Sequence, residues 1–363
     1  MPKVTLAPFW ESLGATLKKE KDWEIASLFK DFASECATIR KRVGLLDLSS
    51  RGKIEVTGRD RIDFLHNVLS NDIKTLGFGK GCYATLLNAK GQILADMNVY
   101  VFDNSILLET ESGLEQTLIE KLSKLRVTEE VDFRNVTKER VILSLQGPKS
   151  EPLVGALIHG PVMMVTEEFQ HTNFSLLGTT VTLVRHSVTG EKGFHLFISD
   201  DKAEAIAKRI LAVGGLYGIK PVGLSAYEIL RIEAGIPRYG IDMDETTLLP
   251  ETGLESIAAS ETKGCYPGQE VVARIKTYGG LSRKLCGLVF EKEGLPKSKE
   301  KVLRDKREIG FVTSACHSPT IGKGIALAYL QKGNFEAGTP VFIQASSLSA
   351  KVTPLPFVPQ PKN

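Results

Sequence analysis

The chain has 363 residues, with 46 lysines and arginines against 43 aspartates and glutamates, and a formal net charge of +3. At roughly 100–200 residues per domain, this length predicts two or three domains, and a hydrophobic content of 42% is enough for their cores. So small a charge on so long a chain excludes the electrostatic footprint of a dedicated DNA-binding protein and indicates no polyanionic partner.

The first twenty residues contain Glu11 and no uninterrupted apolar core of signal-peptide length, and nowhere do 18 apolar residues run together. We therefore expect a soluble, cytoplasmic protein without a membrane partner. The five cysteines are odd in number and widely spaced, which predicts neither a disulfide framework nor a metal site. Except for Cys265, we expect them to be small buried hydrophobes; they are Cys36, Cys82, Cys286 and Cys316.

From residue 52 the chain alternates between strand and helix periodicity. The segment Gly52–Gly58 alternates like a half-buried strand, and Ile62, Leu65 and Leu69 then recur at helical spacing. Three extended segments separated by turn residues follow and predict an antiparallel meander. In order, the expected elements are strands at 83–88, 93–102 and 106–110, a helix at 114–125, strands at 131–136 and 141–145, and a short helix after 146–148.

The second half begins in the same style, with strands at 181–184 and 194–198 and a helix at 203–211, so layered α+β structure is expected. From about Leu281 the helical periodicity disappears, and short strand-like stretches between Gly/Pro turns predict a small β-barrel or sandwich. The charged stretch 292–306 is typical of a solvated hairpin loop. Four prolines in the last ten residues predict an extended tail without a packed role.

The stretch with the densest chemistry is the octet Lys263–Glu270, which reads K-G-C-Y-P-G-Q-E. Pro267 and Gly268 mark the beginning of a helix, so Cys265 would lie just ahead of a helix N-terminus. Exposed backbone N–H groups and the nearby Lys263 would then favour the thiolate form. The alternative is a helix-entry turn whose cysteine is buried.

The octet resembles the K-G-C-Y-x-G-Q-E signature of folate-binding proteins of the YgfZ type, which are relatives of the glycine-cleavage T-protein, an aminomethyltransferase. The resemblance covers roughly residues 44 to 330. It is supported by the segment T-G-E-K-G-F at 189–194, L-R-I-E-A-G-I-P at 230–237, the barrel signature at 318–329, S-N-D at 70–72, and the turn at 88–91.

The resemblance implies an α+β fold in which two intertwined α/β lobes enclose a folate-sized channel and are followed by a small C-terminal β-barrel. The implied limits are a folate-binding region at 1–278 with an inner lobe at about 52–139, the barrel at 279–355, and the Pro-rich tail at 356–363.

The resemblance also implies which residues form the folate site. Glu191 would hold the pterin of tetrahydrofolate, since a carboxylate accepts two parallel N–H bonds, although T-G-E alone also fits an exposed turn. Arg231 would pair with the glutamate tail of folate, or else with Glu233 in the protein. Cys265 and Asp96 are the expected catalytic residues. The other expected cofactor-binding residues are Asn88, Lys263, Tyr266 and Gln269, and no metal ligand is expected.

Two departures from the aminomethyltransferase pattern count against aminomethyl transfer. Those enzymes usually carry an Asp-Asp pair where this chain has Ala95 and Asp96. They often read A-R-D where this chain has Tyr227 in place of the arginine. The site would thus lose one acid and one base.

The leading interpretation is a tetrahydrofolate-binding accessory protein for the assembly or repair of iron–sulfur proteins, with iron–sulfur clients as partners and Cys265 at the channel mouth. One cysteine cannot hold a cluster that needs four ligands, so any cluster contact would be shared or transient. The alternatives are a folate-dependent aminomethyl or one-carbon transferase, which is the activity expected if the chain is an enzyme, and a role linked to tRNA modification, which the net charge supports little.

Overall fold

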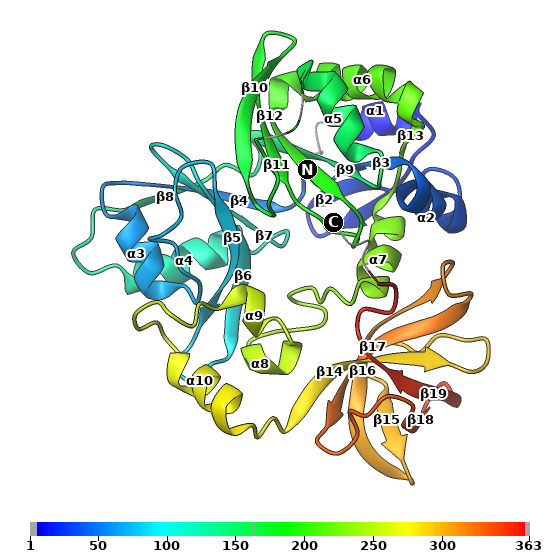
Figure 1. Ribbon diagram of the computed structural model, residues 1–363. Coiled ribbons are helices and arrows are strands. Elements are labelled where there is room, and N and C mark those ends of the chain that lie inside the picture. The colour runs from blue at the N-terminus through cyan, green and yellow to red at the C-terminus, as the bar shows by residue number, and fades with distance from the viewer. Residues whose placement is uncertain (1–5, 161, 163, 360–363) are drawn as a thin grey trace.

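A computed structural model describes residues 6–160, 162 and 164–359 and arranges them as three lobes around a common centre (Figure 1). Two lobes are layers of helices on a sheet, and the third is a closed β-barrel. The expected fold class, two intertwined α/β lobes followed by a C-terminal barrel, is confirmed.

Lobe 1 is built on an antiparallel sheet of five strands in the order β5-β6-β7-β4-β8. The meander that the sequence predicts forms its first three strands. Helices α3 and α4 cover one face, where Phe64, Leu65, Leu118 and Leu122 pack on the apolar side of the sheet. The elements are β4 (Gly52–Thr57), α3 (Arg61–Val68), β5 (Gly81–Leu87), β6 (Ile93–Val101), β7 (Ile106–Thr110), α4 (Glu115–Leu125) and β8 (Asp132–Asn135).

Lobe 2 is built on a sheet of six strands in the order β10-β11-β12-β9-β3-β13. Strand β3 precedes lobe 1 in the chain and β9 follows it, yet the two strands are direct neighbours. Lobe 1 is therefore inserted between adjacent strands of lobe 2. The strands are β3 (Val43–Asp47), β9 (Arg140–Gln146), β10 (His171–Leu176), β11 (Thr179–Arg185), β12 (Gly193–Ser199) and β13 (Ile219–Pro221).

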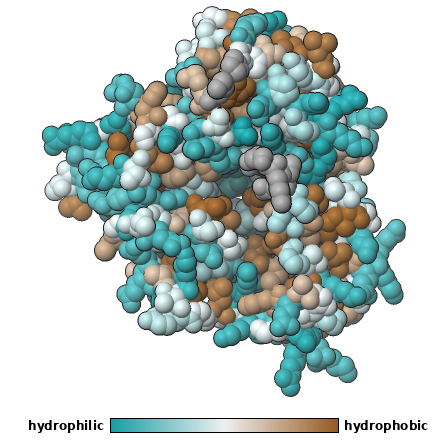
Figure 2. All heavy atoms as spheres, viewed as in Figure 1, coloured by the Kyte–Doolittle hydropathy of each residue, from teal (hydrophilic) through white to brown (hydrophobic). Residues whose placement is uncertain are grey.

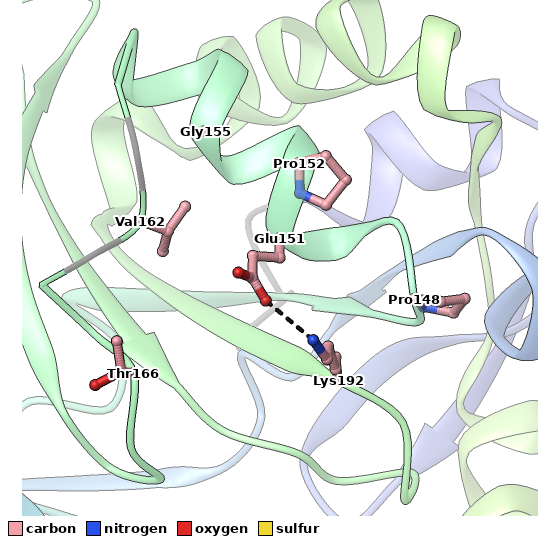
Figure 3. A pocket seen from close by; sticks show the side chains of 7 residues that line it. All are labelled: Pro148, Glu151, Pro152, Gly155, Val162, Thr166 and Lys192. Atoms are coloured by element: carbon pink, nitrogen blue, oxygen red, sulfur yellow. Dashed lines mark hydrogen bonds and ion pairs between the residues drawn. The ribbon is translucent and has the colours of Figure 1, made fainter. Parts of the chain in front are cut away.

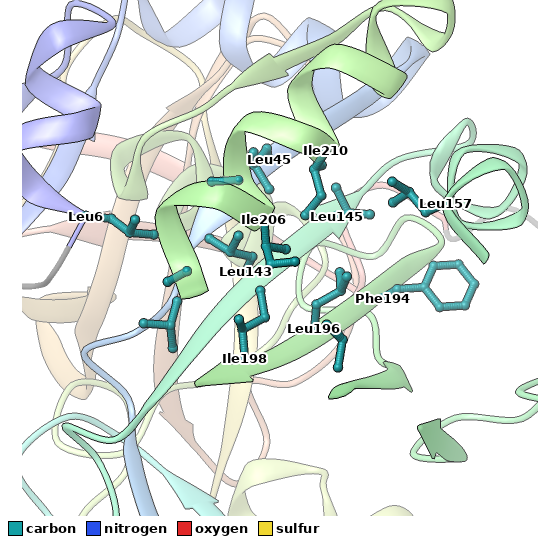
Figure 4. Packing of buried hydrophobic residues seen from close by; sticks show 14 of the residues in the cluster. Leu6, Leu45, Leu143, Leu145, Leu157, Phe194, Leu196, Ile198, Ile206 and Ile210 are labelled. Carbon is teal, nitrogen blue, oxygen red and sulfur yellow. The ribbon is translucent and has the colours of Figure 1, made fainter. Parts of the chain in front are cut away.

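The six-stranded sheet has a core on each face. On one face, Ile206 and Ile210 of α6 pack over Leu143, Leu145 and Leu196 of the strands (Figure 4). On the other face, α2 and α7 share a core with apolar residues of lobe 1 and the barrel, so this second core joins all three lobes. The remaining elements of the lobe are α1 (Ala7–Ser12), the hairpin β1 (Thr16–Glu20) and β2 (Trp23–Leu28), α2 (Phe32–Lys41), α5 (Ser150–Ile158), α6 (Ala203–Gly214) and α7 (Leu224–Glu233).

The barrel closes in the order β14-β17-β16-β15-β18-β19. The prediction of a loop throughout 292–306 was wrong over Lys301–Arg304, which forms β15: Val302 is fully buried there and pairs with β16 and β18. The strands are β14 (Arg283–Phe290), β15 (Lys301–Arg304), β16 (Arg307–Ser318), β17 (Lys323–Gln331), β18 (Pro340–Ile343) and β19 (Leu348–Thr353).

The part of the Pro-rich tail that the structure describes is packed, contrary to the prediction. Leu355 and Phe357 lie against the core that joins the lobes. The Phe357 ring approaches Gly287 so closely that a Cβ there would lie 2.7 Å from it. The backbone N–H of Val358 donates to the carbonyl of Glu233. Two apolar side chains among the prolines thus anchor the tail.

Three short helices lead from lobe 2 to the barrel and pack on an edge of lobe 1. Their small core contains Leu87 and Ile93 of lobe 1 together with Leu249, Tyr266 and Val272. The helices are α8 (Leu249–Thr252), α9 (Glu255–Ala258) and α10 (Gln269–Tyr278). Within the described ranges, none of the helices is both long and apolar enough to cross a membrane.

Candidate functional site

The sheet of lobe 1 has one apolar face and one polar face. Along β6, Ala95, Met97 and Val99 point into the core of the lobe, and the intervening residues Asp96 and Asn98 take the opposite face. In the register of the sheet, Asn98 lies opposite Tyr83 of β5 and Glu109 of β7, and Glu109 lies opposite Lys53 of β4. The polar face thus turns away from the lobe's own core. Figure 2 shows the molecular surface recessed near the centre of the view, where the lobes meet.

Asp96 and Tyr83 form a hydrogen-bonded pair on this face. The Tyr83 hydroxyl donates a hydrogen bond of 2.9 Å to Oδ2 of Asp96. The other oxygen, Oδ1, is buried and has no hydrogen-bond partner among the residues that the structure describes. Burial and the nearby charge of Glu111 raise the pKa of Asp96 to about 6. A carboxyl group of this kind can take up or release a proton near neutral pH.

Two guanidinium groups hold Glu111 beside Asp96. Arg51 reaches Oε1 of Glu111 at 2.7 Å, and Arg238 reaches Oε2 at 2.7 Å. Both cations lower the pKa of Glu111, to about 2, so the carboxylate stays ionised. The backbone of Arg51 is fixed in turn, because the buried ammonium of Lys53 donates to its carbonyl oxygen at 2.9 Å.

Arg238 also contacts helix α7. It forms an ion pair with Glu228, and its guanidinium lies 5.8 Å from the centre of the Tyr227 ring. Position 227 is the one where the sequence departs from the A-R-D pattern. A guanidinium group therefore lies over this part of α7 although the helix itself carries tyrosine there.

The other departure from the aminomethyltransferase pattern, Ala95, lies on the core side of the lobe 1 sheet. Ala95 is buried in the hydrophobic core of lobe 1, whereas its neighbour Asp96 is on the polar face. An aspartate at position 95 would point away from Asp96, because successive side chains of a strand alternate between faces. The alanine removes no acid from the polar face.

Glu191 lies in the turn between β11 and β12 and is 8% exposed. Its Oε1 accepts a hydrogen bond of 2.7 Å from Arg40 of α2, which also pairs with Glu233 of α7 at 2.5 Å. Its Oε2 accepts no hydrogen bond from any described residue, which leaves it available to an N–H donor. Glu191 is thus connected to α7 through Arg40, and the Glu111 carboxylate, whose charge acts on Asp96, is connected to α7 through Arg238.

Arg231 is only 1% exposed and is fully engaged within the protein. Its guanidinium pairs with Asp242 at 2.6 Å and Glu228 at 2.9 Å and donates to Ser314 of the barrel at 2.8 Å. Glu233, which the sequence suggested as the partner of Arg231 within the protein, pairs instead with Arg40. In this structure Arg231 joins α7 to the barrel.

The octet is anchored to lobe 1 by its lysine and tyrosine. The ammonium of Lys263 donates to the carbonyl oxygens of His66, Leu69 and Asn71 at the C-terminal end of α3. The ring of Tyr266 lies 5.0 Å from this ammonium and is buried in the core of the connecting helices. Burial lowers the pKa of Lys263 to about 8. Lys263 thus directs its charge to α3.

The end of the octet packs against the turn at residues 88–92. Asn88 accepts hydrogen bonds from the backbone N–H groups of Lys90 and Gln92 and so closes that turn. Gly268 has φ of +80°, and a Cβ on it would lie 2.6 Å from the carbonyl oxygen of Asn88. Helix α10 begins at the next residue, the half-buried Gln269, as predicted.

Cys265 is left exposed by these contacts. A Cβ added to the preceding Gly264, which is also exposed, would meet no described atom within 4 Å. The other cysteines are buried or half-buried, and burial raises their thiol pKa, for Cys36 and Cys82 to about 12. Cys265 is the accessible thiol of the described chain.

Several residues of this site were not singled out from the sequence. They are Arg51, Tyr83, Glu111 and Arg238. A local signal was present for Tyr83, because it alternates along its predicted strand with the apolar residues Ala84 and Leu86, which take the core face. Arg238 had no such signal, since its partner Glu111 lies 127 positions away in the sequence.

A cavity of about 500 Å³ lies elsewhere on lobe 2, next to α5 (Figure 3). Its acid, Glu151, pairs with Lys192 at 3.4 Å and with Arg185 at 3.7 Å. It contains none of the predicted site residues. Nowhere in the described ranges do three or more histidine, cysteine, aspartate or glutamate side chains gather in a way that could hold a metal ion.

Comparison with known proteins points to one family. Residues 6–262 match the GCVT N-terminal domain, and residues 283–359 match the glycine cleavage T-protein C-terminal barrel domain. The chain is 31% identical to an aminomethyltransferase of Thermoanaerobacter pseudethanolicus over 340 residues, which cover 92% of each protein. It is 29% identical to the aminomethyltransferase of Halalkalibacterium halodurans, with 98% of each covered. The structure of the glycine cleavage system aminomethyltransferase T from Bartonella henselae superposes with a TM-score of 0.88 at 25% identity and covers 99% of this chain and 98% of its own.

Proposed function

Because the chain belongs to the glycine cleavage T-protein family, we propose that it binds tetrahydrofolate where its lobes meet and transfers a one-carbon unit, as an aminomethyltransferase does. The observation that carries the proposal is the buried oxygen Oδ1 of Asp96, which has no hydrogen-bond partner among the described residues. A buried carboxylate oxygen without a partner is costly unless a ligand satisfies it. Asp96 Oδ1 is such an oxygen, on the polar face that turns toward the junction.

The residues present fit this ligand. Tetrahydrofolate supplies the amine nitrogens that carry a one-carbon unit and an amino-pyrimidine edge rich in N–H donors. Oδ1 of Asp96 and Oε2 of Glu191 are the acceptors that such donors need. With a pKa of about 6, Asp96 is largely ionised at pH 7.5 and can accept a proton. The hydroxyl of Tyr83 orients the carboxylate of Asp96 through its hydrogen bond to Oδ2.

The two departures from the transferase pattern do not oppose this proposal. Ala95 lies on the core side of the strand, so the polar face keeps its acid. At position 227, Arg238 brings a guanidinium to the ring of the tyrosine that replaces the expected arginine. We therefore favour transferase activity over an accessory role alone.

Calorimetry with tetrahydrofolate tests the binding step. The wild-type protein should bind it, and Asp96→Asn should bind at least about tenfold more weakly, because a charge-assisted hydrogen bond is lost. Asp63→Asn is the matched control, since Asp63 is an exposed acid of the same lobe that pairs with Lys74. Absence of binding to wild type would overturn the proposal.

The transfer step is tested by following methylene-tetrahydrofolate formation from an aminomethylated lipoyl carrier protein. Activity should be present in wild type and in Asp63→Asn and lost in Asp96→Asn. If wild type binds tetrahydrofolate but forms no product, the protein is a folate-binding relative that does not perform this transfer.

The second candidate is the YgfZ-type role in assembling or repairing iron–sulfur proteins, with iron–sulfur clients as partners. One observation favours it: the contacts of Lys263, Tyr266 and Gly268 anchor the octet and present Cys265 at the surface. In a deletion strain, Cys265→Ser should then fail to restore iron–sulfur enzyme activities, whereas Cys286→Ser should restore them. Full restoration by Cys265→Ser would exclude this role for the thiol.

A further inference from the structure

Arg238 stands where three parts of the molecule meet. Its Nη2 contacts Glu111 of lobe 1 at 2.7 Å, and its Nη1 pairs with Glu228 of α7 in lobe 2. It also lies 3.6 Å from Glu20 of the N-terminal hairpin. The guanidinium carbon lies over the ring of Tyr227, 5.8 Å from its centre. The group is 14% exposed, so solvent screens these contacts little.

Glu111 is held between two cations on its two oxygens. Arg51 takes Oε1 and Arg238 takes Oε2, and both reach it at 2.7 Å. Arg51 is further fixed because its Nε pairs with Glu109 at 2.5 Å. Glu111 therefore cannot change its orientation unless one of the two guanidinium groups moves.

Glu111 belongs to the environment of Asp96. The strand ahead of it ends at Thr110, whose hydroxyl donates to the backbone carbonyl of Asp96 at 2.8 Å. Glu111 thus directly follows the strand that neighbours Asp96, and its charge acts on the Asp96 carboxyl group. The ionisable groups that act on Asp96 are Tyr83 of β5, Glu111 directly after β7 and Arg51 directly before β4, and Asp96 in turn acts on Tyr239 of the loop after α7.

We propose that Arg238 is a positioning residue of the Asp96 site, which clamps Glu111 against Arg51 and so sets the charge that Asp96 faces. Its planar fork contacts Glu111 and Glu228 at once, which a lysine ammonium cannot do with the same geometry. The arginine thereby links the acidity of Asp96 to the docking of lobe 1 on α7. The inference rests on the proposed function only for its effect on catalysis.

The direct test is the titration of Asp96 in the full-length protein, followed by carbon NMR with aspartate labelled at the carboxyl carbon. The signal absent from Asp96→Asn identifies the residue. Glu111→Gln should move the midpoint of Asp96 down by about one pH unit, because a like charge is removed. Arg238→Leu should move it up, because the negative charge of Glu111 is then less neutralised. In Arg238→Lys the midpoint of Asp96 should lie between those of Arg238→Leu and wild type.

A double variant separates the clamp from a direct charge effect. If Arg238 acts through Glu111, Arg238→Leu should shift the Asp96 midpoint less in the Glu111→Gln background than in the wild-type background. The proposal would be overturned if Arg238→Leu shifted the Asp96 midpoint equally in both backgrounds. It would also be overturned if Glu111→Gln and Arg238→Leu shifted this midpoint in the same direction. Circular dichroism and thermal unfolding of each variant identify any that has lost its fold, and Arg238→Lys keeps the test informative in that case.

The catalytic consequence has a separate readout. In the transfer assay, the pH profile of kcat/KM should move in the same direction as the NMR midpoint for each variant. If the NMR midpoints move as expected while no variant or wild type shows transfer, the clamp stands and the proposed function fails. If transfer is present but the midpoints do not move, the clamp fails and the proposed function stands.

Discussion

The hydroxyl of Tyr83 donates to one oxygen of Asp96 at 2.9 Å, while the other oxygen of the same carboxyl group meets no described partner. The two oxygens are therefore not equivalent. Oδ2 is used for orientation, and Oδ1 is left for a ligand. This asymmetry is the basis of the first two predictions.

Asp96→Asn is expected to abolish transfer and to stabilise the fold at neutral pH. The pKa of this carboxyl group rises from 3.8 to about 6 on folding, so between these values the folded state binds more protons than the unfolded state. Folding stability consequently falls as the pH rises through this window. At pH 7.5 the asparagine variant should be more stable than wild type by roughly 1–3 kcal/mol in urea unfolding, with little difference below pH 4. A variant less stable than wild type at pH 7.5 would contradict this account.

Tyr83→Phe removes the hydrogen bond that favours the charged form of Asp96. The pKa of Asp96 should rise further, so the acidic limb of the pH profile of kcat/KM should move to higher pH. Tyr278→Phe is the control, because Tyr278 is 85% exposed at the end of α10. An unchanged profile in Tyr83→Phe would mean that this hydroxyl does not act on Asp96.

Lys263→Met should loosen the attachment of the octet to α3. Three carbonyl oxygens lose a charged donor, which should lower the free energy of unfolding by about 1–3 kcal/mol. Hydrogen exchange at residues 61–71 should become faster. In Lys276→Met only an exposed ion pair with Glu261 is lost, and the expected change is within about 0.5 kcal/mol. Equal effects of the two substitutions would show that the Lys263 contacts do not anchor the octet.

Two glycines allow backbone strain to be separated from steric conflict. Gly268 and Gly253 are both left-handed, with φ of +80° and +77° and ψ near zero, so alanine at either site should lower stability by about 1–2 kcal/mol. A Cβ at Gly268 would in addition lie 2.6 Å from the backbone oxygen of Asn88, whereas at Gly253 it would meet no described atom within 4 Å. Thermal unfolding should therefore show a further loss of about 1–3 kcal/mol for Gly268→Ala alone. Similar values for both variants would argue against close packing of the octet on the turn.

Much of lobe 1 could be predicted because its strands expose one face to apolar and the other to polar surroundings. The alternation of Ile93, Ala95, Met97 and Val99 marks β6 directly. Strand β3 shows no such alternation, since Val43–Leu46 are buried on both faces, and it was not predicted. Strand β15 was not found because Val302 is the only one of its four residues that is fully buried.

The candidate site was predictable only in part, because its parts come from distant segments. Asp96 and the octet could be identified from local sequence. The clamp around Glu111 could not, since Arg51, Glu111 and Arg238 meet only after lobe 1 has docked on α7. A basic residue in a loop such as 234–248 is usually solvated, and nothing local distinguishes Arg238 from such a residue.

The position of β3 next to β9 has a consequence for how the chain assembles. During synthesis β3 emerges more than 90 residues before its neighbour, and the whole of lobe 1 lies between them. If lobe 1 folds first, it brings its own two ends together, since the backbone N–H of Val136 donates to the carbonyl oxygen of Lys53 at 2.9 Å, and it replaces a long flexible loop by a rigid connector. Closing the central sheet of lobe 2 then requires little additional loss of chain entropy, so damage to the core of lobe 1 should delay the folding of lobe 2 as well.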